Sequence, residues 1–379
     1  MRIFENLNFD FLGKRRFFYG ISATIFLLGF INIIIRGLVF GIDFKGGSEI
    51  VLQFQQPIEI AEIRGYVENI ELGNVEVKTF GGETGILIRT ELQEIPSQIY
   101  PRVLENINQA IAQQFPGLPI EVIDSTANSI TYQLPNPDTT DQIVYLLNSG
   151  GFQAGEVSAE PDNRQIIVSV GISDWIKENF RERMPDNPFT VLKEERVGPK
   201  IGAELKEDAV VAVLFSLVVI LIYLGFRFKF IFAAGAVIAL FHDVLITLGL
   251  YALLYDVIPG LNLEINLTVV AAFLTLVGYS INDTVIVFDR VRENLKINKT
   301  MPIKEVLNKS INRTMSRTIL TGGTTLLTIL VLLIFGGEVL RAFAFTLFFG
   351  IVIGTYSSIF VASALVLEYA NRSKKKVQF

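Results

Sequence analysis

The sequence predicts a polytopic α-helical membrane protein with one folded α+β region outside the bilayer. Half of the 379 residues are apolar and the mean hydropathy is +0.46, which exceeds the values of ordinary soluble domains. The apolar residues concentrate in runs of about 20, the length that an α-helix needs to cross a bilayer. One long stretch, residues 41–205, instead shows the alternating apolar and polar pattern of a soluble domain.

Six apolar runs are long enough to span a membrane. They cover residues 17–40, 207–226, 229–254, 265–288, 317–336 and 340–368. The second and third runs meet at Arg227, Phe228 and Lys229, so these two helices must form a tight hairpin. The first run exceeds the roughly 7–15 residues of a signal-peptide core, and no small-residue cleavage site follows it. We interpret it as an uncleaved first transmembrane helix.

The basic residues alternate between the two sides of the predicted bundle. They gather in every second connection, namely 1–17, 227–229, 290–317 and 370–379. The intervening turns, 255–264 and 337–340, contain no Lys or Arg. The positive-inside rule then places both termini in the cytoplasm and residues 41–205 outside the cell membrane.

The external region repeats one order of elements. The first copy has strand 48–54, helix 57–70, strands 74–80 and 85–90, helix 95–115 and strand 119–124. The second has strand 128–134, helix 138–150, strands 153–159 and 164–170, helix 173–184 and strand 188–195. Each copy shows the split βαβ order of a ferredoxin-like module, which predicts two tandem modules.

These patterns divide the chain into five segments. They are the N-terminus with the first helix (1–40), the first module (41–125), the second module with a return segment (126–205), helices two to six (206–369) and a basic cytoplasmic tail (370–379).

The composition excludes several kinds of site. Cysteine is absent and His242 is the single histidine, so disulfides, thiolate metal sites and multi-histidine metal sites are impossible. Residues 41–205 hold 25 acidic and 12 basic residues without a catalytic constellation, which favours a binding or spacing module over an enzyme. Basic residues near helix ends indicate an anionic lipid bilayer as partner rather than nucleic acid. We expect no cofactor and no metal.

The fourth run carries the most informative ionisable residue, Asp283, in the sequence GYSINDTVIVFDR. It lies about 9 Å from the centre of the span, still within the hydrocarbon core. Asn282 is its neighbour. Intramembrane acids usually face the bundle interior and mark ion pathways, so we favour a proton pathway over a static contact between helices.

The third run contains His242 and Asp243 near its midpoint. As neighbours on a helix they point about 100° apart, so we expect that they cannot both face one groove fully. Two interpretations stand open: a second proton-handling pair, and a packing contact between helices.

Arg317 opens the fifth predicted helix. It either extends to the cytoplasmic headgroups or pairs with Asp283, and charge placement alone favours the headgroups. Nearby hydroxyl groups can hydrogen-bond or hold water along the same wall; they belong to Thr321, Thr324 and Thr325. Gly322 and Gly323 permit close approach of another helix.

The sixth run carries Gly350 and Gly354, followed by Ser357 and Ser358. The four-residue spacing of the two glycines is the small-residue pattern of membrane helix contacts. We interpret this segment as packing rather than chemistry.

Several short motifs occur in a fixed order along nearly the whole chain. They are GIDFKGG at 41–47, VGP at 197–199, FHD at 241–243, GYSINDTVIVFDRVREN at 278–294, SRT at 316–318, FGG at 335–337 and GTYSS at 354–358. In this order and topology they resemble the SecF family of the RND-like superfamily.

The resemblance implies a six-helix half bundle that pairs with SecD. It implies proton-driven assistance to preprotein export beside the SecYEG channel, in the bacterial cytoplasmic membrane. It places the family's essential membrane carboxylate at Asp283 and the companion arginine at Arg317. For Arg317 it therefore favours the functional interpretation, pairing with Asp283, over extension to the headgroups. The second module departs from the usual single external domain, so nothing carries over to it.

Two other functions would use the same helices. An RND-type exporter of small molecules or lipids needs a substrate pocket in the external region. A passive assembly scaffold would tolerate neutral substitutions at Asp283 and Arg317. An intramembrane aspartyl protease is disfavoured, because it needs paired aspartates in a GxGD-like setting and GYSIND does not provide one.

Overall fold

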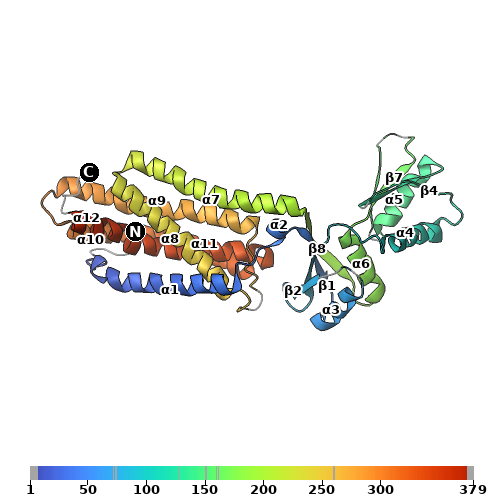
Figure 1. The fold of residues 1–379 in the computed structure, drawn as a ribbon, viewed down its shortest axis with the longest axis horizontal. Coiled ribbons are helices and arrows are strands. Elements are labelled where there is room, and N and C mark those ends of the chain that lie inside the picture. Colours follow the sequence, from blue (N-terminus) through green and yellow to red (C-terminus); the bar gives the residue numbers. More distant parts are fainter. Residues whose placement is uncertain are drawn as a thin grey trace. The chain divides into compact units, whose positions relative to one another are not determined.

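A computed structural model describes residues 7–70, 72, 75–126, 128–149, 152–158, 160, 162–258 and 261–373. The chain divides into two compact units, one formed by Ile42–Ala203 and the other by the residues on either side. Figure 1 labels many of the elements of both units. Most of the predicted basic tail, residues 374–379, lies outside the described residues.

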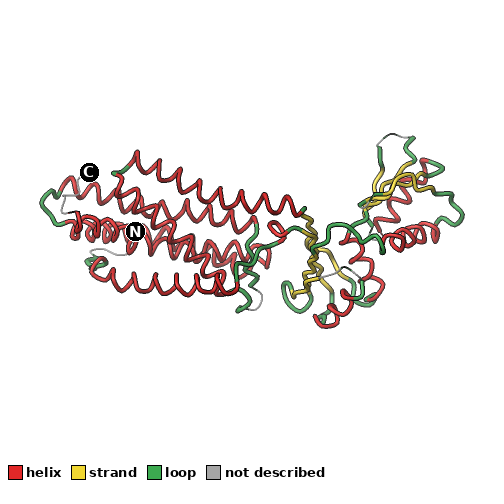
Figure 2. The backbone as a smooth tube through the Cα atoms, viewed as in Figure 1, coloured by secondary structure: helices red, strands yellow, loops and turns green. Residues whose placement is uncertain are grey.

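The flanking residues form a helical bundle, drawn in red in Figure 2. Its helices are α1 (Arg15–Arg36), α7 (Pro199–Arg227), α8 (Phe230–Leu254), α9 (Leu267–Ile297), α10 (Ile303–Phe335), α11 (Gly337–Ser357) and α12 (Ser363–Ser373). A π-helical turn at Ser358–Ala362 joins α11 to α12. Six helices in the described residues are long and apolar enough to cross a membrane, which confirms the six predicted spans and the tight turn between α7 and α8.

α10 begins earlier than predicted. It starts at Ile303, so Arg317 lies in the middle of a 33-residue helix rather than at its first turn. The extra turns are polar and escaped the hydropathy pattern. They stay helical because Val306, Leu307 and Ile311 are fully buried against the rest of the bundle.

Small residues let α9 and α11 approach closely. A Cβ atom added to Gly350 would lie 2.6 Å from Leu276, and one added to Gly354 would lie 2.8 Å from the Ser280 hydroxyl oxygen. Both distances are too short for a real side chain. The predicted packing role of these glycines is therefore confirmed.

The unit Ile42–Ala203 contains two four-stranded antiparallel sheets. The first has the order β2-β3-β1-β8, with β1 at Gly47–Phe54, β2 at Val75–Thr79, β3 at Gly85–Thr90 and β8 at Phe189–Val197. The second has the order β4-β5-β7-β6, with β4 at Glu121–Ser125, β5 at Ser129–Gln133, β6 at Gln153–Glu156 and β7 at Gln165–Ser169. The helices are α2 (Ile42–Lys45), α3 (Ile60–Glu68), α4 (Tyr100–Gln114), α5 (Thr140–Ser149) and α6 (Ile172–Arg183).

The two sheets exchange their last strands relative to the predicted tandem copies. The strand predicted at 119–124 pairs with β5 rather than with β1, and the strand predicted at 188–195 pairs with β1. The helices follow the strands, because α4 contacts α5 and α6 contacts β1. A boundary at residue 125 is therefore wrong. The second module is inserted between β3 and α6 of the first.

A buried charge cluster holds β8 in the first sheet. Glu49 of β1 accepts a 2.9 Å hydrogen bond from Nε of Arg89 on β3 and binds Nζ of Lys193 on β8 at 3.0 Å. The Glu49 side chain is only 3% exposed. A buried carboxylate needs such partners, and the segment 119–124 has no Lys or Arg to supply one.

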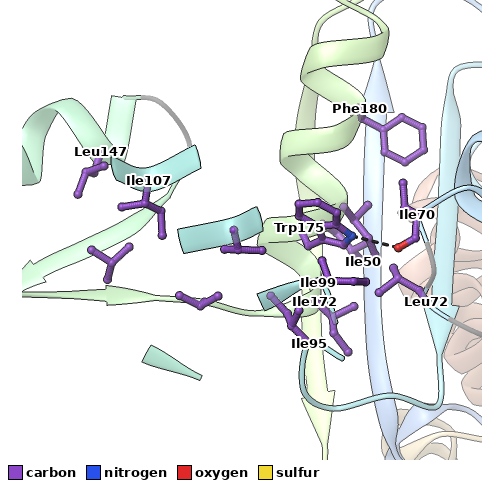
Figure 3. Packing of buried hydrophobic residues seen from close by; sticks show 14 of the residues in the cluster. Ile50, Ile70, Leu72, Ile95, Ile99, Ile107, Leu147, Ile172, Trp175 and Phe180 are labelled. Atoms are coloured by element: carbon purple, nitrogen blue, oxygen red, sulfur yellow. Dashed lines mark hydrogen bonds between the residues drawn. The ribbon is translucent and has the colours of Figure 1, made fainter. Parts of the chain in front are cut away.

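The first module has a hydrophobic core around Trp175 of α6 (Figure 3). The indole Nε1 donates a 3.1 Å hydrogen bond to the Ile70 carbonyl oxygen, and the ring is 2% exposed. Ile95 and Ile99 belong to the same core beside Ile172 (Figure 3), so the segments entering and leaving the insertion pack at one place.

The GG motif forms the turn between α2 and β1. Gly46 and Gly47 have φ values of 76° and 115°, a region that side chains rarely adopt. A Cβ atom on Gly46 would also lie 2.8 Å from Pro199. Gly46 is therefore required by its backbone conformation and by the approach to Pro199, and Gly47 by its backbone conformation and by its approach to Thr90.

Candidate functional site

The register of α9 is set at its first turn. The side chain of Asn266 caps the helix by accepting a 2.9 Å hydrogen bond from the Val269 backbone N–H. From this start, Ser280, Asp283 and Thr284 fall on one buried face, since residues three and four apart share a helix face. Asp283 therefore lies on the inward face of α9, as predicted.

Asp283 is buried among neutral groups. The residue is only 2% exposed, and its Oδ2 atom accepts a 3.0 Å hydrogen bond from the Thr355 hydroxyl of α11. Gly322 of α10 lies over this pair, because a Cβ atom there would be 3.8 Å from the Thr355 oxygen. The carboxyl group thus sits where three helices meet.

Arg317 lies outside this contact. It is exposed and, within the described part of the chain, forms no ion pair shorter than 4.0 Å with Asp283, although it is close enough to interact electrostatically. It lines an open cleft of about 1430 Å³ beside the N-terminal half of α10. The basic residues lining this cleft are Arg290, Lys304, Lys309, Arg313 and Arg317.

The other predicted residues on these helices do not join Asp283. Asn282 is exposed on a different face of α9. The hydroxyls of Thr321, Thr324 and Thr325 each donate to a carbonyl oxygen one turn earlier in α10. Thr321 also lines the cleft, and Thr325 accepts a 3.2 Å hydrogen bond from the Tyr279 hydroxyl.

His242 and Asp243 face different neighbouring helices, and their side chains also contact each other. The His242 Nδ1 atom lies 3.0 Å from Asp243 Oδ1. Their Cβ atoms do point in different directions, but the imidazole ring is long enough to turn back to the carboxyl group. Asp243 is 1% exposed and faces α9 and α11, whereas the far nitrogen of His242 contacts Ser22 of α1.

Serine and threonine hydroxyl groups complete the site, and the sequence pattern singled out only Ser357 among them. Ser280 of α9 and Ser357 of α11 donate to Asp243 Oδ2 at 2.6 and 2.8 Å. The interpretation of Ser357 as packing alone is therefore wrong. Thr355 was missed because a lone hydroxyl in an apolar run also bonds its own helix, and only its place in the GTYSS motif could have pointed to it.

Comparison with known proteins identifies the relatives. The family "Protein export membrane protein SecD/SecF, C-terminal" matches residues 176–372, and "SecD/SecF GG Motif" matches residues 31–58. The SecF subunit of the protein translocase from Rhodothermus marinus is 40% identical over 98% of this chain and 97% of its own length. The chain belongs to the SecF family.

Other relatives agree with this membership. The SecF subunit of Koribacter versatilis is 36% identical over 97% of the chain and 93% of its own length. The crystal structure of SecDF, a translocon-associated membrane protein from Thermus, superposes with a TM-score of 0.65 and 30% identity. The chain covers 39% of that structure, and the structure covers 97% of the chain. As a multi-pass SecF protein, the chain has a role in protein translocation.

Proposed function

We propose that this SecF chain converts proton movement through Asp283 into assistance for preprotein export, together with SecD and the SecYEG channel. We place both termini in the cytoplasm and the unit Ile42–Ala203 outside the bacterial cytoplasmic membrane. The basic residues of the connecting loops support this orientation.

The single observation that carries the proposal is the neutral surrounding of Asp283. An ionised carboxylate in the membrane needs a cation or several donors, and among the described residues only the Thr355 hydroxyl donates a hydrogen bond to it. Burial favours the neutral form of a carboxyl group and a nearby cation favours the ionised form. We therefore propose that Asp283 is protonated in this conformation and that approach of Arg317 releases the proton.

The energy available is sufficient for a conformational switch. One proton that crosses about 100 mV releases about 2.3 kcal/mol. This amount shifts a two-state equilibrium by more than tenfold. We propose that the shift moves the helices that contact Asp283 and so moves the external unit, which holds the emerging polypeptide.

Exposed polar faces on α9 and α10 support SecD as the partner. Small and polar residues recur on the exposed side of α9 at Thr268, Ala271, Thr275, Gly278 and Asn282. On α10 the exposed residues include Arg317, Thr321, Thr324 and Thr328. Lipid tails cannot hydrogen-bond such groups, so these faces suit another polar membrane helix.

The test replaces Asp283 by Asn in membranes that contain SecD and the channel. We expect Asp283→Asn to insert normally but to lose proton-dependent stimulation of export. Asp289→Asn is the matched control on the same helix, because Asp289 is partly exposed and pairs with Arg227 at 3.0 Å. Full stimulation in Asp283→Asn would reject the role of this carboxyl group.

A further inference from the structure

A continuous chain of hydrogen bonds leads away from Asp243. The His242 Nε2 atom lies 3.0 Å from the Ser22 hydroxyl, which lies 2.8 Å from the Tyr356 hydroxyl. The Tyr356 hydroxyl lies 2.6 Å from the Phe18 carbonyl oxygen. With the 3.0 Å contact between Asp243 and His242, four links connect the middle of α8 with the first turn of α1.

Each hydroxyl group in this series of hydrogen bonds has one hydrogen atom. The donor of every bond can therefore be worked out by starting from the Phe18 carbonyl oxygen. A carbonyl oxygen only accepts, so Tyr356 donates to Phe18. Tyr356 has then no hydrogen left for Ser22, so Ser22 donates to Tyr356. Ser22 in turn has none for the imidazole, and His242 Nε2 must carry a hydrogen.

The last link fixes how many protons the His242–Asp243 pair holds. Because Nε2 carries a hydrogen, the short contact between Nδ1 and Oδ1 needs one more. It sits either on Nδ1, which gives an imidazolium beside a carboxylate, or on Oδ1, which gives a neutral imidazole beside a carboxylic acid. In both cases the pair holds one proton beyond a neutral histidine and an ionised aspartate.

We propose that His242 and Asp243 form a second proton-binding site in the bundle, which exchanges its proton through Ser22 and Tyr356. The inference deepens the proposed use of protons at Asp283 and rests on it for its purpose. Ser280 and Ser357 donate to the other oxygen of Asp243 in either form, so they hold the carboxyl group without fixing its charge.

Release of this proton from the His242–Asp243 pair reverses the direction of the hydrogen bonds. The Nε2 hydrogen moves to the Ser22 oxygen, the Ser22 hydrogen moves to the Tyr356 oxygen, and the Tyr356 hydrogen leaves to water. The remaining proton stays on Nδ1 towards Asp243, and Phe18 loses its donor. Atoms balance, since one proton leaves and each hydroxyl keeps one hydrogen.

Two further titratable groups, Tyr19 and Glu368, lie near Tyr356. The Tyr19 hydroxyl is buried and, among the described residues, has no hydrogen-bond partner. It is close enough to Tyr356 and Glu368 to interact electrostatically, and Glu368 pairs with Arg15 at 2.8 Å. Among the described residues, the hydrogen-bonded chain therefore ends at Tyr356 and Phe18.

The titratable groups that face the pair are few. Tyr356 comes from α11, where its ring stacks on His242 at 6.3 Å, and Asp283 lies one turn from Ser280 on α9. Within the described residues, the ion pairs of Asp243 include only His242. The protonation of the pair therefore depends chiefly on its own two members and on the direction of the hydroxyl chain.

The test uses the fact that the chain has a single histidine. Full-length protein with ¹⁵N-histidine, purified without a polyhistidine tag and placed in lipid bilayers, gives nitrogen signals from His242 alone. Spectra are recorded from about pH 5 to about pH 9, the range that spans histidine titration. We expect a protonated Nε2 at the acidic end and a bare Nε2 with protonated Nδ1 at the alkaline end.

Two variants probe the chain itself. In Tyr356→Phe and in Ser22→Ala, the donor order that forces a hydrogen onto Nε2 is lost, so we expect the pH of the Nε2 transition to shift. Tyr279→Phe is the control, because its hydroxyl contacts Thr321 and Thr325 of α10 instead. It should leave the His242 signals unchanged.

Three outcomes would overturn the proposal: a bare Nε2 at every pH, a protonated Nε2 at every pH, or equal spectra for Tyr356→Phe and the unmodified protein. The spectra do not depend on Asp283 or on export. Hence the loss of stimulation in Asp283→Asn with an invariant His242 would reject this inference alone. Full stimulation in Asp283→Asn with a titrating His242 would reject the proposed function alone.

Discussion

Thr355 and Ser357 lie two residues apart on α11, and each donates a hydrogen bond to a different buried carboxyl group. Thr355 reaches Asp283 at 3.0 Å, and Ser357 reaches Asp243 at 2.8 Å. The π-helical turn Ser358–Ala362 follows directly, a geometry that often occurs at functional sites. One short segment of α11 therefore forms hydrogen bonds with both carboxyl groups, which come from different helices.

The first prediction concerns Thr355. Thr355→Val keeps the shape of the side chain but removes the donor to Asp283, and an unsatisfied buried acceptor costs about 1–3 kcal/mol. We expect proton-dependent stimulation of export to fall by roughly tenfold, whereas Thr355→Ser should retain it. Thr328→Val is the control, since that hydroxyl donates within α10. Equal export rates for Thr355→Val and Thr328→Val would contradict the prediction.

The second prediction concerns the contact between α9 and α11. Gly354→Ala places a methyl group 2.8 Å from the Ser280 oxygen, so the helices must separate. Overpacking of this kind costs about 1–3 kcal/mol, and thermal unfolding in detergent should occur at a lower temperature. Gly20→Ala on α1 has no atom within 4 Å of the added carbon and should not lower the unfolding temperature. An unchanged unfolding temperature for Gly354→Ala would show that the contact is looser than described.

The third prediction concerns the charge cluster on β1. Glu49→Ala leaves Arg89 and Lys193 without their shared buried carboxylate, which should lower the free energy of unfolding by about 3–5 kcal/mol. Glu76 also contacts Arg89 but is 40% exposed, so Glu76→Ala should cost less than about 1 kcal/mol. Trp175 is the single tryptophan, and its fluorescence reports unfolding of the external unit. Similar losses in the two variants would argue against the cluster as the anchor of β8.

The fourth prediction concerns the pH dependence of the external unit. Burial raises the pKa of Glu178, which accepts a 2.7 Å hydrogen bond from Asn106 of α4. A carboxyl group with a raised pKa binds its proton more tightly in the folded than in the unfolded chain. The free energy of unfolding therefore falls as the pH rises from about 4.3, the usual value for Glu, through the folded pKa, and is constant above it.

Glu178→Gln removes this loss and retains an oxygen to accept from Asn106. We expect the variant to need more urea for unfolding than the unmodified protein at neutral pH, with the difference vanishing below about pH 4. Trp175 fluorescence provides the measurement. Glu68→Gln, at an exposed position of α3, should behave like the unmodified protein at every pH. A Glu178→Gln advantage that persists in acid would point to a cause other than titration.

The sequence determined the features that depend on residues close together in the chain. The six spans follow from local hydropathy, and the strands and helices of the external unit follow from local periodicity; both agree with the structure. The two membrane carboxyl groups, Asp283 and Asp243, were also found, because an acid in an apolar run stands out by itself.

Only the tertiary structure decided which segments pair and which groups reach the carboxyl groups. Strands 119–124 and 188–195 hold the same place in their repeats, so the local order of elements cannot predict which sheet each strand joins. The ion pair between Glu49 of β1 and Lys193 of β8, which forms only in the tertiary structure, distinguishes them. Ser22, Thr355 and Tyr356 look like ordinary helix residues until α1, α8, α9 and α11 are packed together. Hydrogen bonds between distant segments depend on helix rotation and approach, which side chains far apart in the sequence settle jointly.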